Sequence, residues 1–165
     1  MEDAIYYDEE QIRKMARSLI DALDYLHNKV NIVHRDIKPQ NVLLDESGAP
    51  LLVDFGKSQI LSSVTDFTKE NDLTTSIEGT YTFLPPECCS LTETSQVAYS
   101  MKKADVWSLG VTLYIITYNR FPYELLPNVD GRCTTEMDLL DTISHFQLSF
   151  PDSQRKVSSE LRQLL

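Results

Sequence analysis

The chain has 165 residues, of which 42% are hydrophobic and 24% are charged, an ordinary composition for one soluble domain with a hydrophobic core. Its formal net charge is −10 and no basic stripe is visible, which argues against nucleic-acid binding and makes solubility the simplest reason for the acidity. Cys88, Cys89 and Cys133 have neither a CxxC spacing nor a nearby histidine cluster, so we expect reduced thiols rather than a zinc site or a disulfide framework.

No targeting or membrane-spanning pattern is apparent in the sequence. The first ten residues are acidic, whereas a signal peptide begins basic and then turns apolar. The most apolar run, Val106 to Ile116, is too short to span a bilayer, which takes about 20 apolar residues. Because this run is apolar on nearly all sides, it predicts a helix buried in a protein core. We expect a cytoplasmic or nuclear protein without a membrane partner.

The first predicted element is a helix over about Asp8 to His27. Asp8 is a plausible capping residue with Gln11 three positions later, and apolar residues follow at helical spacing: Ile12, Met15, Ala16, Leu19, Leu23 and Leu26. The short runs "IVH" and "VLL" then predict strands on either side of a polar stretch. After the turn "ESGA", the run "PLLVDF" predicts a further strand that completes a hairpin, with Asp54 at its exit.

The second half of the chain is predicted to be mostly helical. From Gly56 to Gly79 it is polar and without a clear period, which predicts a long surface loop. "PPECC" predicts the start of a helix, and residues 90–99 read as a polar connector. Helices are predicted over about 103–118, over about 135–146 and from about Ser158 onward. The predicted fold class is therefore mainly α with short β-hairpins.

The most informative stretch is the polar loop, residues 34–41, "HRDIKPQN". Cations at Arg35 and Lys38 would keep Asp36 ionised, so that its carboxylate could orient a hydroxyl nucleophile and accept its proton. Lys38 could neutralise charge on the group under attack. Asn41 and Asp54 offer the oxygen ligands that Mg²⁺ takes together with phosphate and water. This set of side chains is typical of a site for a metal-bound phosphate.

The polar loop followed by "VDFG" resembles the catalytic and metal loops of eukaryotic protein kinases. "GTYTFLPPE" resembles the segment of that family that ends in Ala-Pro-Glu, with Pro85 in place of alanine, and "ADVWSLGVTLY" resembles its central buried helix. Four motifs in the right order cover almost the whole chain. The resemblance implies a partial kinase domain over 1–165, with a catalytic loop at 34–41, a metal loop at 54–56, an activation segment at 54–87 and a buried helix at about 103–118.

The resemblance also implies roles for single residues and the cofactors ATP and Mg²⁺. Asp36 would position the substrate hydroxyl and take its proton, and Lys38 would contact the transferred phosphoryl group and so the bound ATP. Thr80 would hydrogen-bond near both residues. Asn41 and Asp54 would hold magnesium and, through it, the nucleotide.

Other residues are expected to support this machinery. Phe55 and Gly56 would set the orientation of Asp54, in the DFG turn (residues 54–56), and His34 is expected to be structural rather than titrating. Asp105 would tie the buried helix to the backbone of the polar loop. Glu87 would pair with an arginine from a later helix.

Further positions indicate the type of kinase and its regulation. Lys38 two positions after Asp36, and Thr80 after Gly79, resemble serine/threonine kinases, which act on protein substrates. Gln40 stands where kinases that prefer basic substrates often carry glutamate, although a solvent-facing Gln40 is nearly as good an explanation. Arg35 is implied to bind a phosphate added to the activation segment by an upstream kinase. Ser76 is the best match for that phosphosite and Thr75 the next, and an unmodified polar loop is the alternative.

The sequence also departs from the family pattern. None of its five glycines forms a GxGxxG loop, and no segment resembles the strand lysine that contacts ATP or its glutamate partner. We therefore expect a C-terminal lobe whose N-terminal lobe is supplied in cis, little or no activity of this chain alone, and an apolar face where that lobe would pack. Within the family, the chain looks most like calcium/calmodulin-dependent kinases and their upstream kinases.

Two functions stay open on the sequence alone. One is the catalytic lobe of a serine/threonine protein kinase, and the other is a non-catalytic, kinase-like interaction module. The intact Asp36, Lys38, Asn41 and Asp54 favour the kinase, because a scaffold has no need of them.

Overall fold

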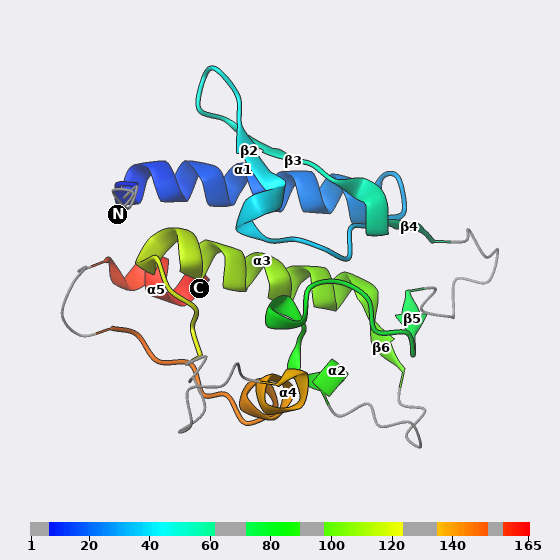
Figure 1. Cartoon of the computed structure of the whole chain (residues 1–165). Helices are drawn as coiled ribbons and strands as arrows, with labels where there is room; N and C mark the ends of the chain where they lie inside the picture. Colours follow the sequence, from blue (N-terminus) through cyan, green and yellow to red (C-terminus); the bar gives the residue numbers. More distant parts are fainter. Residues whose placement is uncertain (1–6, 62–71, 90–97, 124–134, 152–156) are drawn as a thin grey trace.

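The computed structural model describes residues 7–61, 72–89, 98–123, 135–151 and 157–165. Two long helices, α1 (Glu9–Asn28) and α3 (Met101–Tyr118), lie side by side (Figure 1). The short helices α2 (Pro86–Cys89) and α4 (Glu136–Ser144) lie on the opposite side of α3 from α1, and α5 (Ser159–Leu164) lies near the C-terminal end of α3. The predicted mainly helical fold with small sheets is thus observed in the described residues.

Helix α1 begins and packs as its sequence predicts. Asp8 accepts a hydrogen bond from the backbone N–H of Gln11, and the Gln11 side chain accepts one from the backbone N–H of Asp8, which completes a capping box. The apolar stripe of the helix is buried, including Ala16, Leu19 and Leu23. These side chains pack against Leu109 and Leu113 of α3, with Ile37 of the polar loop between them.

Eight of the 18 residues of helix α3 are buried and most of the others are half-buried, which agrees with the expected buried helix, although Val106 at the start of the apolar run is 58% exposed. Each fully buried aliphatic side chain of this kind contributes about 1.5–3 kcal/mol of hydrophobic stabilisation. The hydroxyl groups of Thr112 and Thr117 are buried as well, and each donates to the carbonyl four residues earlier. The helix begins at Met101 and not near Lys103 as predicted, because Ser100 accepts a hydrogen bond from the backbone N–H of Lys103 and so acts as its cap.

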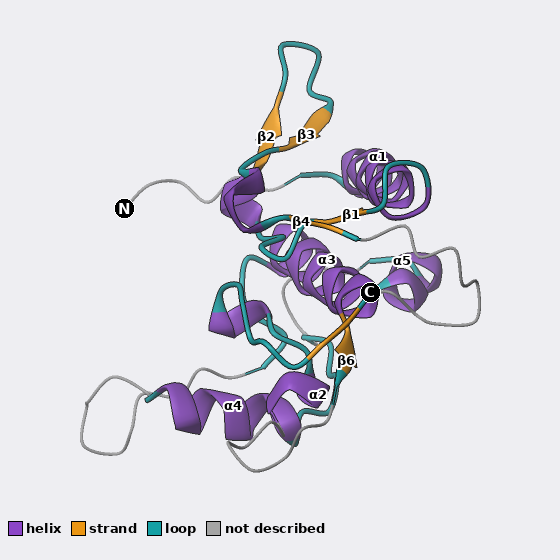
Figure 2. Ribbon diagram, turned by 90° about the vertical axis from the view of Figure 1, so that its right-hand side faces the viewer, coloured by secondary structure: helices purple, strands orange, loops and turns teal. Residues whose placement is uncertain are grey.

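The described residues form three two-stranded antiparallel sheets. β2 (Val42–Leu44) pairs with β3 (Pro50–Leu52) in the predicted hairpin, with Leu43 opposite Leu51. β1 (Ile32–Val33) pairs with β4 (Gln59–Ile60), and β5 (Leu73–Thr74) pairs with β6 (Tyr99–Ser100). Figure 2 shows the β2–β3 hairpin projecting away from the helices, at the opposite end of the molecule from α4.

The prediction of a loop without structure over 56–79 is wrong for its described part. The 3₁₀ turn η2 (Phe55–Lys57) and strands β4 and β5 lie in this range, and residues 62–71 lie outside the described residues. The expected connector at 90–99 likewise ends in strand β6, while 90–97 are not described. These strands are two residues long and pair with distant segments, so no local alternation in the sequence marks them.

The other predicted helices are present with shifted ends. Thr135 and Ser158 are the caps of α4 and α5 and lie just outside them, and α4 ends at Ser144, two residues earlier than expected. The aromatic ring of Trp107 on α3 meets Phe146, just after α4, edge to face at a centroid distance of 6.2 Å. Trp107 Nε1 is buried and has no acceptor among the described residues.

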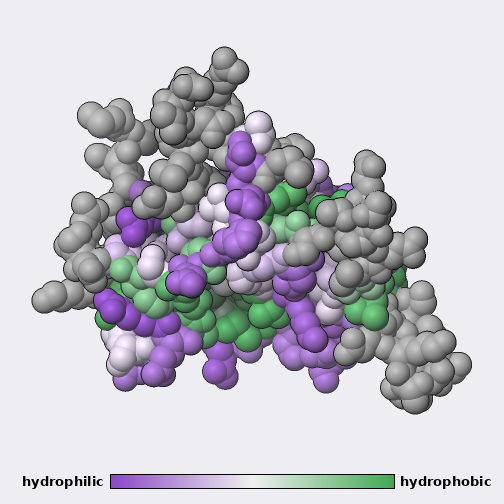
Figure 3. Space-filling model, turned by 90° about the horizontal axis from the view of Figure 1, so that it is seen from below, coloured by the Kyte–Doolittle hydropathy of each residue, from purple (hydrophilic) through white to green (hydrophobic). Residues whose placement is uncertain are grey.

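On the face seen from below, on the side of α2 and α4, hydrophobic and hydrophilic residues alternate (Figure 3). Cys88 and Cys89 are free thiols, and burial raises the pKa of Cys88 to about 12 and that of Cys89 to about 11. Cys133 lies outside the described residues. Among the described residues, no helix is both long and apolar enough to cross a membrane.

One buried carboxylate of α3 holds the polar loop in place. Asp105 is 1% exposed and accepts hydrogen bonds from the backbone N–H groups of His34 and Arg35, both at 2.8 Å. Its Oδ2 atom also lies 2.8 Å from Nε2 of His27 on α1. The expected link between the buried helix and the polar loop is confirmed, and it extends to α1.

We expect Asp105→Ala to lower the free energy of unfolding by about 3–5 kcal/mol, because it would leave two buried N–H groups and His27 without their acceptor. Urea denaturation followed by circular dichroism measures this loss. Asp21→Ala is the matched control, since Asp21 forms only an exposed ion pair with Arg17 and its loss should leave the unfolding midpoint nearly unchanged. Equal midpoints for the two variants would contradict the role of Asp105.

Candidate active site

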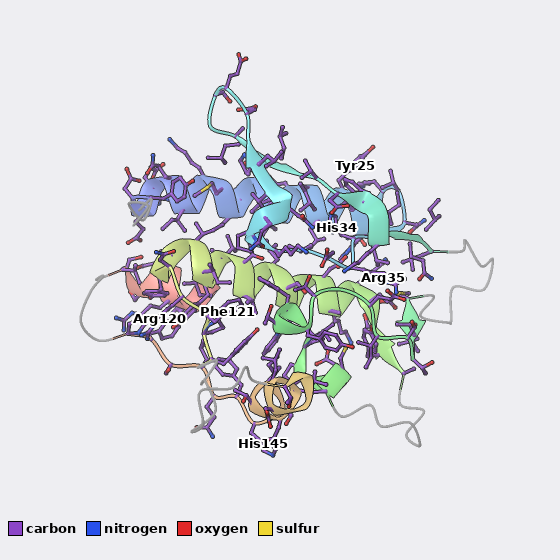
Figure 4. The ribbon with its side chains drawn as sticks, in the orientation of Figure 1. Tyr25, His34, Arg35, Arg120, Phe121 and His145 are labelled. Carbon is purple, nitrogen blue, oxygen red and sulfur yellow. The ribbon has the colours of Figure 1, made fainter. Side chains whose placement is uncertain are left out.

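The polar loop and the DFG turn lie against each other between α1 and α3. The backbone N–H of Val53 donates to the carbonyl of Asn41 at 3.0 Å, and His34 Nε2 lies 3.1 Å from the carbonyl of Val53. The ring of His34 is fully buried and its centroid lies 4.9 Å from that of Phe55. Figure 4 shows His34 in the layer between the two helices and Arg35 near the N-terminal end of α3. His34 therefore has the structural position that was expected of it.

Asp36 is the centre of the polar contacts. Its side chain is 5% exposed, Lys38 Nζ donates to its Oδ2 at 2.9 Å, and Thr80 Oγ1 donates to its Oδ1 at 2.7 Å. Lys38 Nζ also lies 2.9 Å from Thr80 Oγ1, which closes a triangle of three side chains. The structure thus brings the three predicted catalytic side chains into direct contact.

The electrostatics favour an ionised Asp36. Burial by itself would raise the pKa of this carboxyl group, but hydrogen bonds from Thr80 and Lys38, together with the positive charges of Lys38 and Lys57, outweigh burial and hold the pKa below its ordinary value. At neutral pH the group is a carboxylate that accepts hydrogen bonds. Such a carboxylate is able to orient a hydroxyl group, and it gains a proton once that hydroxyl becomes acidic during its reaction.

Asn41 and Asp54, the predicted metal ligands, come from adjacent turns. Asn41 is buried, and its Nδ2 donates to the backbone carbonyl of Asp36 at 2.8 Å, which leaves the amide oxygen without a donor among the described residues. Asp54 has a left-handed backbone, with φ of 63°, and its Oδ1 accepts a hydrogen bond from the N–H of Gly56 at 3.2 Å. Its side chain is exposed, so the second oxygen is accessible.

An amide oxygen and a carboxylate fit a hard cation such as Mg²⁺, which usually takes one or two protein oxygens beside phosphate and water. No cluster of three or more His, Cys, Asp or Glu residues suited to a metal occurs in the described part of the chain. Asn41 and Asp54 are joined only through the backbone hydrogen bond of Val53 to Asn41. Two protein oxygens leave most of the coordination shell of Mg²⁺ open, so phosphate oxygens and water would have to fill it.

Lys57 is a site residue that sequence reasoning missed. Its Nζ lies 3.6 Å from Asp36 Oδ2, and its side chain is 42% exposed. The residue follows the DFG turn directly, but a lysine in a polar segment is most often a solvated surface residue, and only the three-dimensional fold shows its neighbour. The carboxylate of Asp36 therefore faces the ammonium groups of Lys38 and Lys57, whereas the sequence predicted Lys38 and Arg35 as its cationic partners.

Arg35, the expected phosphate-binding residue, is already paired in the structure. Its Nη1 donates to Gln59 Oε1 at 2.7 Å, and its Nη2 lies 3.7 Å from Glu78 Oε1. The two candidate phosphosites, Thr75 and Ser76, are exposed and lie two to three residues before Glu78. Neither contacts Arg35. Gln59 and Glu78 carry no sequence signal that would have identified them as its partners.

The segment that carries the candidate phosphosites is anchored to the start of α3. Ser100 Oγ donates to Asp72, and the backbone N–H of Met101 donates to the Asp72 carbonyl at 2.8 Å. Tyr99 is buried, and its hydroxyl donates to the backbone carbonyl of Ser76 at 2.8 Å. The backbone of Ser76 is therefore held in place while its side chain faces solvent.

Gly79 is required where this segment meets the polar loop. Its φ is 114°, and a Cβ atom added there would lie 2.6 Å from the carbonyl oxygen of Arg35. Both the left-handed backbone and the close approach exclude any side chain. The contact places Thr80, the next residue, beside Asp36. Glu87, at the end of the "GTYTFLPPE" motif, is exposed and has no ion-pair partner among the described residues.

Exposed apolar side chains lie on the segments that carry Asn41 and Asp54. Leu43 and Leu51 lie opposite each other on the β2–β3 hairpin and are 53% and 50% exposed, and Phe55 is 46% exposed. A separate groove of about 690 Å³ lies between α1 and the turn of the hairpin, with Arg13, Lys14 and Ser47 among its lining residues. Neither Asp36 nor Asp54 lines this groove, so the polar contacts and not this cavity define the candidate site.

The sequence of this chain is similar to those of known proteins. The chain is 41% identical over 119 residues to the calcium/calmodulin-dependent protein kinase kinase cmkC of Emericella nidulans, an overlap of 72% of this chain and 21% of the relative. It is 33% identical over 161 residues to the serine/threonine-protein kinase TOUSLED of Arabidopsis thaliana, an overlap of 95% of this chain and 22% of the relative. It is 43% identical over 105 residues to the MAP kinase kinase mkk-4 of Caenorhabditis elegans, with overlaps of 64% and 26%.

The aligned part of this chain covers about a fifth to a quarter of the length of each of these relatives. The family model described as "Protein kinase domain" matches residues 1–165. The match of this model over the whole chain indicates the same family as the named relatives and the order of the motifs. The chain therefore belongs to the eukaryotic protein kinase family, of the serine/threonine type.

Proposed function

We propose that this chain is the C-terminal, catalytic lobe of a protein kinase domain that transfers the γ-phosphoryl group of ATP to a serine or threonine hydroxyl of a protein substrate. The observation that carries the proposal is the triangle of Asp36, Lys38 and Thr80, in which a buried carboxylate is held ionised by a lysine and a hydroxyl. Phosphoryl transfer depends mainly on positioning and charge stabilisation, and this triangle supplies both.

In the proposed reaction, Asp36 accepts a hydrogen bond from the acceptor hydroxyl and later its proton. Lys38 stabilises the negative charge of the phosphoryl group during its transfer. Thr80 holds the carboxylate of Asp36 and the amine of Lys38 in place relative to each other. Asn41 and Asp54 would hold Mg²⁺, which neutralises nucleotide phosphate charge when bound. The buried amide of Asn41 also donates to the backbone of Asp36 and so couples the two halves of the site.

We further propose that a glycine-rich loop and a strand lysine come from an N-terminal lobe in the same protein, outside these 165 residues. The exposed apolar side chains of Leu43, Leu51 and Phe55 lie within three residues of Asn41 or Asp54 in the sequence and suit such a neighbour. Without that lobe the nucleotide has half of its binding surface, and this chain alone should transfer phosphate poorly. The non-catalytic interaction module remains the alternative, and the compartment, cytoplasmic or nuclear, stays a prediction.

The first experiment uses this chain fused behind an N-terminal kinase lobe, here called the completed kinase. We expect it to phosphorylate a generic protein substrate, and Asp36→Asn to lower kcat by about 10²–10⁴-fold because the proton acceptor is lost. Radiolabelled phosphate transfer measures the rate. Asp21→Asn, an exposed change on α1, should leave the rate unaltered. Full activity of the Asp36 variant would instead favour the non-catalytic module.

The second prediction concerns the metal. Asp54→Asn should weaken the binding of ADP to the completed kinase in the presence of Mg²⁺ and leave its metal-free binding unchanged, because a carboxylate ligand becomes a neutral amide. Isothermal titration calorimetry with and without Mg²⁺ measures the difference, with the exposed Glu46→Gln as control. An identical magnesium effect in the variant and the parent protein would remove Asp54 from the metal site.

The third prediction concerns regulation. We propose that phosphorylation by an upstream kinase at Ser76, or at Thr75, displaces Glu78 from Arg35, since a phosphate carries more negative charge and more acceptor oxygens than a carboxylate. Thr75→Ala with Ser76→Ala should then prevent an activation of roughly tenfold, equivalent to one charge-assisted hydrogen bond of about 1.4 kcal/mol. The assay compares the completed kinase before and after treatment with upstream kinase, and equal activation of parent and double variant would rule out both sites.

A further inference from the structure

The carboxylate of Asp36 has more cationic partners than its charge requires. Lys38 Nζ at 2.9 Å and Thr80 Oγ1 at 2.7 Å already give it an ion pair and a short hydrogen bond. Lys57 adds a second ammonium group 3.6 Å from the same oxygen, which is beyond hydrogen-bonding distance. The contact with Lys57 is therefore the one that Asp36 loses at the lowest cost.

Lys57 is also the accessible partner. Its side chain is 42% exposed, compared with 21% for Lys38 and 5% for Asp36. Among the charged groups that contact the carboxylate in the described residues, it is the one nearest to solvent. Lys57 is therefore the charged partner of Asp36 that is most accessible to an acceptor peptide arriving from solvent.

The backbone beneath Lys57 is fixed, although the side chain is free to swing. Lys57 ends the 3₁₀ turn η2, in which the N–H of Ser58 donates to the carbonyl of Phe55 at 3.0 Å. Ser58 Oγ also donates to the carbonyl of His34 at 3.4 Å, which joins the turn to the polar loop. A lysine has a flexible four-carbon stem and a strongly hydrated charge, so its ammonium group can leave Asp36 without moving the turn.

We propose that Lys57 makes the site selective for the charge of the residue next to the acceptor serine or threonine of a peptide. Its ammonium group leaves Asp36 for an anionic side chain directly next to the acceptor serine or threonine, so the site favours acceptors with an acidic neighbour. A basic neighbour would instead meet two like charges, Lys57 and Lys38. This inference rests on the proposed function, because it requires an acceptor hydroxyl at Asp36.

Lys57 could meet negative charge from two sources, the acidic side chain of a peptide and the phosphates of a nucleotide. A binding experiment distinguishes between them. Fluorescence anisotropy measures the affinity of this chain, free of nucleotide and metal, for two labelled peptides that differ only in Ser-Glu against Ser-Gln. We expect the Ser-Glu peptide to bind about two- to fivefold more tightly, the range for a partly exposed ion pair. Lys57→Met should remove this preference, Lys57→Arg should keep it, and added salt should reduce it.

Lys14→Met is the matched control, because it removes one positive charge from a 74% exposed position on α1 and should keep the preference. Equal affinity for the two peptides in the parent chain, or binding of neither peptide, overturns the proposal. If Lys57→Met weakens ADP binding but keeps the preference for the Ser-Glu peptide, Lys57 interacts with the nucleotide. That result overturns the proposal as well. No phosphate transfer is measured here, so an inactive completed kinase, together with a chain that still prefers Ser-Glu, would contradict only the proposed function.

Discussion

The hydrogen bonds that Asp105 accepts from the polar loop are the constraint on which the rest of the site depends. A carboxylate that is 1% exposed binds the backbone N–H groups of two consecutive residues, His34 and Arg35, and stays next to His27 of α1. Arg35 has a left-handed backbone, with φ of 67°, and the hydrogen bond to its N–H helps to hold that conformation. Because the chain turns at this point, the next residue, Asp36, faces Lys38 and Thr80 and not α3.

The site that results is assembled from three segments that are far apart in the sequence. The polar loop supplies the carboxylate and the amide, the DFG turn supplies a second carboxylate and is followed by Lys57, and the residues around Gly79 supply the hydroxyl of Thr80. Each junction between segments includes a backbone contact: Val53 to Asn41 in one case, and Gly79 against Arg35 in the other. Main-chain packing therefore helps to position the side-chain chemistry, and a side chain at position 79 would push Thr80 away from Asp36.

The sequence alone predicted the elements whose signals are local. The capping box of α1, the buried run of α3 and the β2–β3 hairpin each follow from residues within a few positions of one another, and all three are present. Strands β4, β5 and β6 were missed, because each is two residues long and forms only against a distant partner. The polar loop and the DFG turn were identified through a family resemblance. Lys57, Gln59 and Glu78 were missed, because their roles arise only from which side chains they meet in space.

The contact of Trp107 with Phe146 has a consequence for following this molecule in solution. The chain has a single tryptophan, whose indole lies at the junction of α3 with the segment that follows α4 and whose nitrogen is buried away from water. All tryptophan emission therefore comes from one interface. If the region around α4 separates from α3 while the Asp105 network stays intact, the emission shifts to longer wavelength before the helical signal falls, so optical spectroscopy can resolve stepwise unfolding without an added label.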